Sequence, residues 1–168
     1  MYHASLEKYT LDFKHPSGTS RGVLTQKDSW FVRIWDDNNP NIIGIGEASI
    51  IKTLSPEWND NYESFLTKVA ENINDYVDNG MDKLKGYPSI YFAIETAILD
   101  LNNGGNGILY SSEFTNQHAP IKINGLIWMG AKEFMLEQIK AKIDAGYDCI
   151  KMKIGAIDFE TELELLTF

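Results

Sequence analysis

The sequence is poor in cysteine and in basic residues. Cys149 is the only cysteine, so the chain cannot form an internal disulfide. Lys and Arg number 15 against 24 Asp and Glu, which gives a net charge of -9, and the basic residues form no cluster. Binding to nucleic acid or to an anionic membrane surface needs such a cluster, so we expect neither of these partners.

Long apolar stretches are also missing. No apolar run approaches the roughly 20 residues that span a bilayer. The N-terminus lacks the apolar core of a signal peptide. The hydrophobic share is nevertheless 43%, an ordinary value for a chain that buries a core. Together these features predict a globular cytoplasmic protein.

The first fifty residues have the pattern of an antiparallel sheet. Segments 3–14, 29–35 and 42–48 mix β-branched and aromatic residues with polar ones, which is typical of strands. Residues 15–22 are rich in Gly, Ser and Thr and contain a proline, and they predict a loop. Short connections between the strands favour a three-stranded meander.

Two helical patterns follow the predicted strands. The Ser-Pro-Glu sequence at 55–57 is a typical helix start, and apolar residues then recur at helical spacing as far as Gly80. A second pattern begins near Pro88 and stops at the two glycines 104–105. Residues 1–117 are therefore predicted to be an α+β domain of three strands followed by helices.

The last third of the sequence alternates strand and helix. Strands are predicted at 121–126 and 149–155, with a helix at 131–145 between them and a second helix capped by Asp158. This alternation is typical of a parallel sheet or barrel. We predict that residues 118–168 are the first two β/α units of a barrel. The helical pattern has no ending signal, so we expect a truncated barrel.

The sequence Lys151-Met152-Lys153 is the strongest candidate site. Because side chains alternate in a strand, Met152 would face covering helices while both lysines face the other way, roughly 6.6 Å apart. Two partly desolvated ammonium groups that close disfavour each other's charge, and a lysine moved toward neutrality can act as a general base. The competing interpretation is a solvated strand face. Expected burial and the position at the carboxyl end of a strand favour the functional interpretation.

The predicted loop at 15–22 carries one cation, Arg21, next to Thr19 and Ser20. A guanidinium on a mobile loop could bind a carboxylate substrate, although the same sequence also fits an ordinary surface hairpin. Glu47 could equally pair with a cation or face solvent.

Other residues have weaker claims to a function. The three histidines lack metal-ligand spacing. Gly44-Ile45-Gly46 lacks the third glycine of a dinucleotide fingerprint. Cys149 begins a strand that should be buried, so we interpret it as a packing residue.

Several of these stretches resemble a known family. Residues 44–48, 93–101 and 145–155 are similar to the muconate-lactonizing subgroup of the enolase superfamily. Within it, residues 17–24 and 123–130 resemble the o-succinylbenzoate synthases of menaquinone biosynthesis. The resemblance extends over essentially the whole chain. It implies an α+β capping domain followed by the start of a TIM-type barrel.

The resemblance also implies a reaction. Enzymes of this type remove water from a cyclohexadiene carboxylate by way of a metal-stabilised enediolate, so the expected partner is a small carboxylate. Lys153 would be the acid/base and Lys151 would help to hold the carboxylate, while Thr19, Ser20 and Arg21 would close over the substrate. The family's Mg²⁺ ligands lie on later barrel strands. Mg²⁺ is therefore expected in the intact enzyme but not on this chain.

Two alternatives stay open. A dipeptide epimerase or a muconate cycloisomerase shares the same frame, and a non-catalytic dimeric structural or binding module could use the same fold. In each case two barrel units would leave apolar faces and an edge strand uncovered. We therefore expect either a homo-oligomer or a C-terminal portion that covers them.

Overall fold

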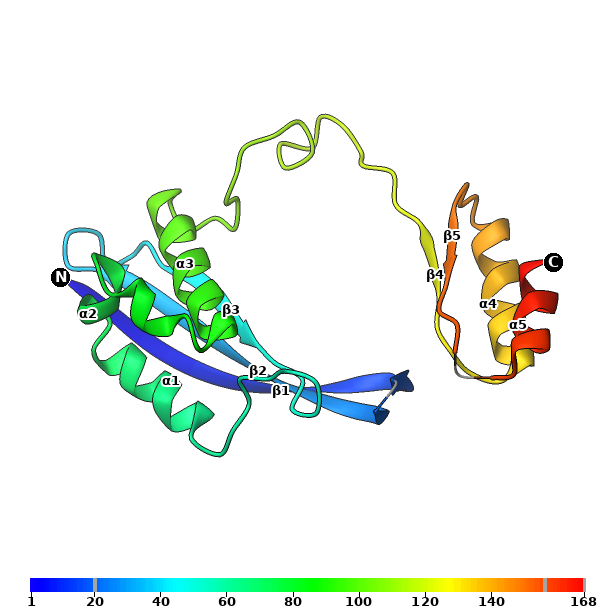
Figure 1. Cartoon of the computed structure of the whole chain (residues 1–168). Helices are drawn as coiled ribbons and strands as arrows, with labels where there is room; N and C mark the ends of the chain where they lie inside the picture. Colours follow the sequence, from blue (N-terminus) through cyan, green and yellow to red (C-terminus); the bar gives the residue numbers. More distant parts are fainter. Residues whose placement is uncertain (20, 156, 168) are drawn as a thin grey trace. The chain divides into compact units, whose positions relative to one another are not determined.

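The computed structural model describes residues 1–167 apart from 20 and 156, and it separates into two compact units (Figure 1). The first unit contains residues 1–12 and 26–116, and the second contains residues 13–25 and 117–168. In the described part of the chain, no helix has the length and apolarity that a membrane crossing requires.

The order of the helices and strands is that of an α+β unit followed by two β/α units. In chain order they are β1 (Tyr2–Thr19), β2 (Gly22–Asp36), β3 (Gly44–Ser49), α1 (Tyr62–Glu71), α2 (Asn74–Val77), the 3₁₀ helix η1 (Met81–Leu84), α3 (Pro88–Asn102), β4 (Gly125–Ile127), α4 (Lys132–Asp144), β5 (Ile150–Met152) and α5 (Phe159–Leu166).

Strands β1, β2 and β3 form one sheet in that order, which confirms the predicted meander. Strands β2 and β3 are antiparallel, with Trp30 opposite Ala48. The predicted loop at 15–22 is wrong in its extent, because β1 continues to Thr19 and β2 begins at Gly22. The loop was predicted partly because of Pro16, which lacks a backbone N–H. Strand β1 is an edge strand, where a missing N–H is tolerated.

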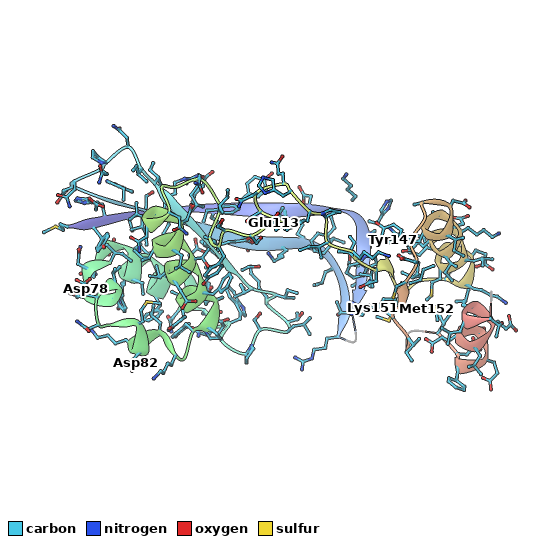
Figure 2. The ribbon with its side chains drawn as sticks, turned by 90° about the horizontal axis from the view of Figure 1, so that it is seen from above. Asp78, Asp82, Glu113, Tyr147, Lys151 and Met152 are labelled. Carbon is cyan, nitrogen blue, oxygen red and sulfur yellow. The ribbon has the colours of Figure 1, made fainter. Side chains whose placement is uncertain are left out.

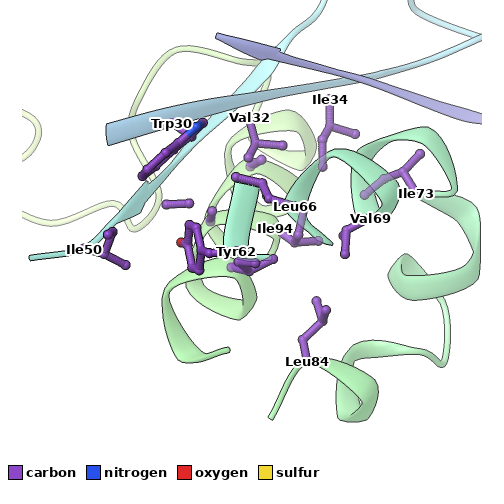
Figure 3. Packing of buried hydrophobic residues seen from close by; sticks show 14 of the residues in the cluster. Trp30, Val32, Ile34, Ile50, Tyr62, Leu66, Val69, Ile73, Leu84 and Ile94 are labelled. Carbon is purple, nitrogen blue, oxygen red and sulfur yellow. The ribbon is translucent and has the colours of Figure 1, made fainter. Parts of the chain in front are cut away.

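One face of this sheet packs against helices α1 and α3. Every second side chain of β2 from Trp30 to Ile34 is buried, as the period of a strand requires. These side chains meet apolar residues of the helices and of neighbouring turns (Figure 3). The fully buried residues of this cluster include Trp30, Val32, Ile34, Ala48, Tyr62, Leu66, Val69, Ile90, Ala93, Ile94 and Ala97.

The helix predicted to begin at residue 56 begins instead at Tyr62. Ser55 does not cap a helix, because its hydroxyl accepts a hydrogen bond from the Ile51 N–H at 2.9 Å and closes a turn. The predicted single helix is also divided into α1 and α2, and η1 follows after its predicted end at Gly80. Helix α3, by contrast, runs from Pro88 to Asn102, close to its prediction.

Two glycines let β3 lie directly on the backbone of α3. A Cβ atom at Gly44 would be 1.9 Å from the Ala97 carbonyl oxygen, and one at Gly46 would be 1.9 Å from the Ala93 carbonyl oxygen. The glycines that do not form a dinucleotide fingerprint therefore have a packing role. Asp100 ties the same two elements together, since its carboxylate, on a residue only 4% exposed, accepts from the Ile45 N–H at 2.9 Å.

Glu47 on β3 pairs with a cation and a hydroxyl of β2. The Ser29 hydroxyl donates to Glu47 Oε1 at 2.6 Å, and Lys27 Nζ lies 3.2 Å from the same oxygen. The Ser29 hydrogen bond, and after it Lys27, hold the pKa of Glu47 below its usual value of 4.5 despite some opposing desolvation. The sequence had left this pairing open.

We expect part of the stability of this sheet to disappear as the pH falls below about 4.5. The pKa of Glu47 is lower in the folded chain than in the unfolded chain, so the stabilisation is present at higher pH and is lost as pH falls through the folded pKa. Ser29→Ala removes the largest cause of the shift. Its free energy of unfolding in urea should therefore vary less over this acid range than that of the wild type, with the exposed Ser5→Ala as control. Equal acid dependence in both chains would contradict the assignment.

Candidate active site

Strands β4 and β5 pair in parallel, with α4 and α5 covering one face of the pair (Figure 1). The predicted order of strand, helix, strand and helix is confirmed, although both strands are shorter than expected. A small core lies between sheet and helices. Its buried residues are Ile127, Met135, Ile139 and Leu165, with Ile150 and Met152 packed against them.

Capping residues fix the end of α4 and the start of α5. Gly146 follows α4 with a φ of 81°, the left-handed conformation that ends many helices. The Asp158 carboxylate accepts a hydrogen bond from the Thr161 N–H at 2.9 Å, as the sequence predicted for an N-cap. Glu162 is only 5% exposed, and its carboxylate accepts from the Gly155 N–H. The segment that follows β5 is therefore held from the first turns of α5.

Strand alternation separates the two lysines from the core. Ile150 and Met152 pack against the helices, so alternation places Lys151 and Lys153 on the opposite face of the sheet. Lys151 and Met152 are labelled in Figure 2. Lys153 stands just beyond the carboxyl end of β5, and its N–H donates to the Ile127 carbonyl at 3.3 Å. The same alternation predicts that Ile154 faces the helices, and this is wrong, because its side chain is 60% exposed beyond the end of the strand.

The expectation that this strand is buried on both faces also needs correction. Lys151 is exposed, Lys153 is half-buried, and Cys149 is exposed instead of packed inside. The physical reason is that α4 and α5 cover only one face of a two-stranded sheet. Burial of the second face would require further strands of a closed barrel.

Trp128 lies beside Lys153 on the open face. The centroid of its ring is 4.5 Å from Lys153 Nζ, a cation–π distance worth about 0.5–1 kcal/mol at an exposed site. The Trp128 backbone is bound by Gln138 of α4, which accepts from its N–H at 3.0 Å and donates to its carbonyl at 3.1 Å. No role in the site was predicted for Trp128 or Gln138 from the sequence. The register of β4 and β5 could have placed Trp128, but no sequence signal indicated Gln138.

The tip of the β1–β2 hairpin holds the predicted substrate-binding residues. The Thr19 hydroxyl donates to the Gly22 carbonyl at 2.8 Å and accepts from the Arg21 N–H at 3.2 Å, so it closes the turn. Arg21 is exposed, and Ser20 lies outside the described residues. Residues 13–25 belong to the same compact unit as the two lysines.

A magnesium ion finds no ligand set within the described chain. Among residues 1–19, 21–155 and 157–167, no three His, Cys, Asp or Glu side chains gather in a way that could hold a metal. The described residues therefore do not fit the metal that the family resemblance implies.

Comparison with known proteins identifies relatives of this arrangement, although no family model matches the sequence. The o-succinylbenzoate synthase of Desulfotalea psychrophila is 39% identical over 197 residues, which cover 96% of this chain and 52% of that protein. The crystal structure of MenC from the same organism matches with a TM-score of 0.73 and 32% identity, over 99% of this chain and 52% of that one. The dipeptide epimerase of Enterococcus faecalis, complexed with Mg and a dipeptide, matches with a TM-score of 0.75 at 17% identity over 98% of this chain and 48% of that one, and shows the fold alone.

The three-stranded sheet with its helices, followed by parallel β/α units, has the fold of about half of the enolase-superfamily structures that it matches. The sequence is similar to o-succinylbenzoate synthase, as the sequence analysis predicted. The chain spans about half the length of that relative.

Proposed function

We propose that this chain is the first part of an o-succinylbenzoate synthase, in which Lys153 moves the proton next to the substrate carboxylate. In this proposal residues 1–117 form the capping domain and residues 118–168 the first two β/α units of the barrel. The position of Lys153 carries the proposal. It lies at the carboxyl end of a parallel strand, on the face away from the helices, where barrel enzymes keep their chemistry.

The residues of this chain would contribute binding and proton transfer. Lys153 would take the proton as general base. Lys151, on the same strand face, would bind the carboxylate of the substrate. The hairpin tip with Thr19, Ser20 and Arg21 would close over the substrate and exclude water. The Mg that the Enterococcus faecalis structure contains would need ligands from outside this chain.

The runner-up function is that of a dipeptide epimerase. The fold does not separate the two functions, because the Enterococcus faecalis epimerase matches with a TM-score of 0.75 and MenC with 0.73. Sequence identity favours the synthase, with 39% against 17%. A cytoplasmic location and self-association stay predictions.

A chimera separates the two functions. Residues 1–168 replace the matched half of the Desulfotalea psychrophila synthase, and the product is purified and tested on the cyclohexadiene carboxylate and on a set of dipeptides. We expect dehydration of the carboxylate and no epimerisation. Epimerisation without dehydration would assign the runner-up function. A folded chimera with neither activity would favour a non-catalytic module.

A further inference from the structure

Trp128 and Lys153 directly follow the last paired residues of β4 and β5, and their side chains lie next to each other. The register ends with Ile127 opposite Met152, so Trp128 and Lys153 are the residues that leave the two strands at the same end. The Lys153 N–H donates to the Ile127 carbonyl at 3.3 Å, a hydrogen bond of this last pair that holds the Lys153 backbone beside β4. Both side chains therefore stand on the open face, where the Lys153 ammonium lies over the Trp128 ring.

Gln138 holds the backbone of Trp128 at both of its polar groups. Its Oε1 accepts from the Trp128 N–H at 3.0 Å, and its Nε2 donates to the Trp128 carbonyl at 3.1 Å. Strand β4 ends at Ile127, so the side-chain amide of Gln138 takes the place that another strand would have beside Trp128. Gln138 is itself fixed, because Met135 and Ile139 of the same helix are buried in the core.

We propose that Gln138 and Trp128 are positioning residues for Lys153. Gln138 sets the backbone of Trp128, and the Trp128 ring then holds one side of the Lys153 ammonium. A lysine side chain has four rotatable bonds and would otherwise sample many positions on an open face. The ring leaves the other side of the Lys153 amine open toward the proton that it would transfer. This inference deepens the proposed function and rests on the role that it gives to Lys153.

The position of Lys153 can be measured in the 168-residue chain without turnover. An ammonium over a ring places its Hε protons in the ring current, so we expect them to be shifted upfield in NMR spectra of lysine-labelled protein, with the signal assigned by Lys153→Arg. Trp128→Leu should abolish the displacement, and Trp128→Phe should retain part of it. Gln138→Met, which keeps the shape but loses both hydrogen bonds, should reduce it. Glu137→Ala, an exposed neighbour on α4, is the control.

Three results would overturn the inference. One is a Lys153 signal at the position of the other lysines in the wild type, and another is a displacement that survives Trp128→Leu. The third is an unchanged displacement in Gln138→Met, with the methyl signals of Met135 and Ile139 showing that the core is intact. If Gln138→Met loses those signals, the comparison of Trp128→Phe with Trp128→Leu still tests the inference. A displacement that is partly kept in Trp128→Phe and lost in Trp128→Leu supports it, and an equal displacement in both variants overturns it. Because no activity is measured, failure here is distinct from failure of the proposed synthase function.

Discussion

Lys153→Ala is expected to abolish dehydration by the chimera that carries residues 1–168. Removing a general base typically costs about 10²–10⁴-fold in rate. Lys153→Arg should be just as inactive, because a guanidinium keeps the charge but does not deprotonate in proteins. Steady-state kinetics measure kcat and KM, and circular dichroism confirms the fold.

Lys151→Ala is the matched comparison on the same strand face. Lys151 is exposed, and its proposed role is to bind the carboxylate, so its loss should raise KM more than it lowers kcat. A variant Lys153→Ala that turns over substrate at the wild-type rate would refute the acid/base role. Equal effects of both variants on KM alone would show that the pair only binds the substrate.

Gly46→Ala is expected to destabilise the capping sheet severely. The added Cβ would lie 1.9 Å from the Ala93 carbonyl oxygen, and backbone cannot rotate aside as a side chain can. Relief requires β3 and α3 to separate, which would also strain the hydrogen bond from Ile45 to Asp100. Overpacking of a core typically costs about 1–3 kcal/mol and sometimes more, and we expect the upper end or beyond. Urea unfolding measures the loss.

Gly86→Ala is the control for this prediction. Gly86 lies in an exposed turn of the same unit, and a Cβ there would meet nothing within 4 Å. Its free energy of unfolding should stay within about 0.5 kcal/mol of the wild type, as for other surface changes. If Gly46→Ala unfolds at the same urea concentration as Gly86→Ala, α3 does not lie as close to β3 as the structure shows.

The sequence predicted those parts of the fold whose signals are local. The strands of the meander and helix α3 were found because apolar residues recur at periods that identify strands and helices. The hairpin tip was missed because Pro16 and the surrounding small residues suggest a loop, whereas pairing between β1 and β2 is a tertiary effect. The start of α1 was missed because Ser55 closes a turn in place of capping a helix.

In the candidate site, too, features with a local sequence signal were predicted and those that depend on tertiary packing were not. Alternation along one strand correctly placed the two lysines on the face opposite Met152. The expected burial of that face was wrong, because helices cover only one side of the two-stranded sheet. Gln138 was beyond reach for a different reason, since its contact with Trp128 depends on how α4 packs across β4.

Dehydration of the cyclohexadiene carboxylate by the unmutated chimera is the decisive test of whether residues 1–168 are part of an o-succinylbenzoate synthase. We expect turnover comparable to that of the parent synthase, because residues 1–168 would supply the proton-transferring lysine and the covering hairpin. A chimera that folds and binds magnesium but leaves the carboxylate unchanged would contradict it.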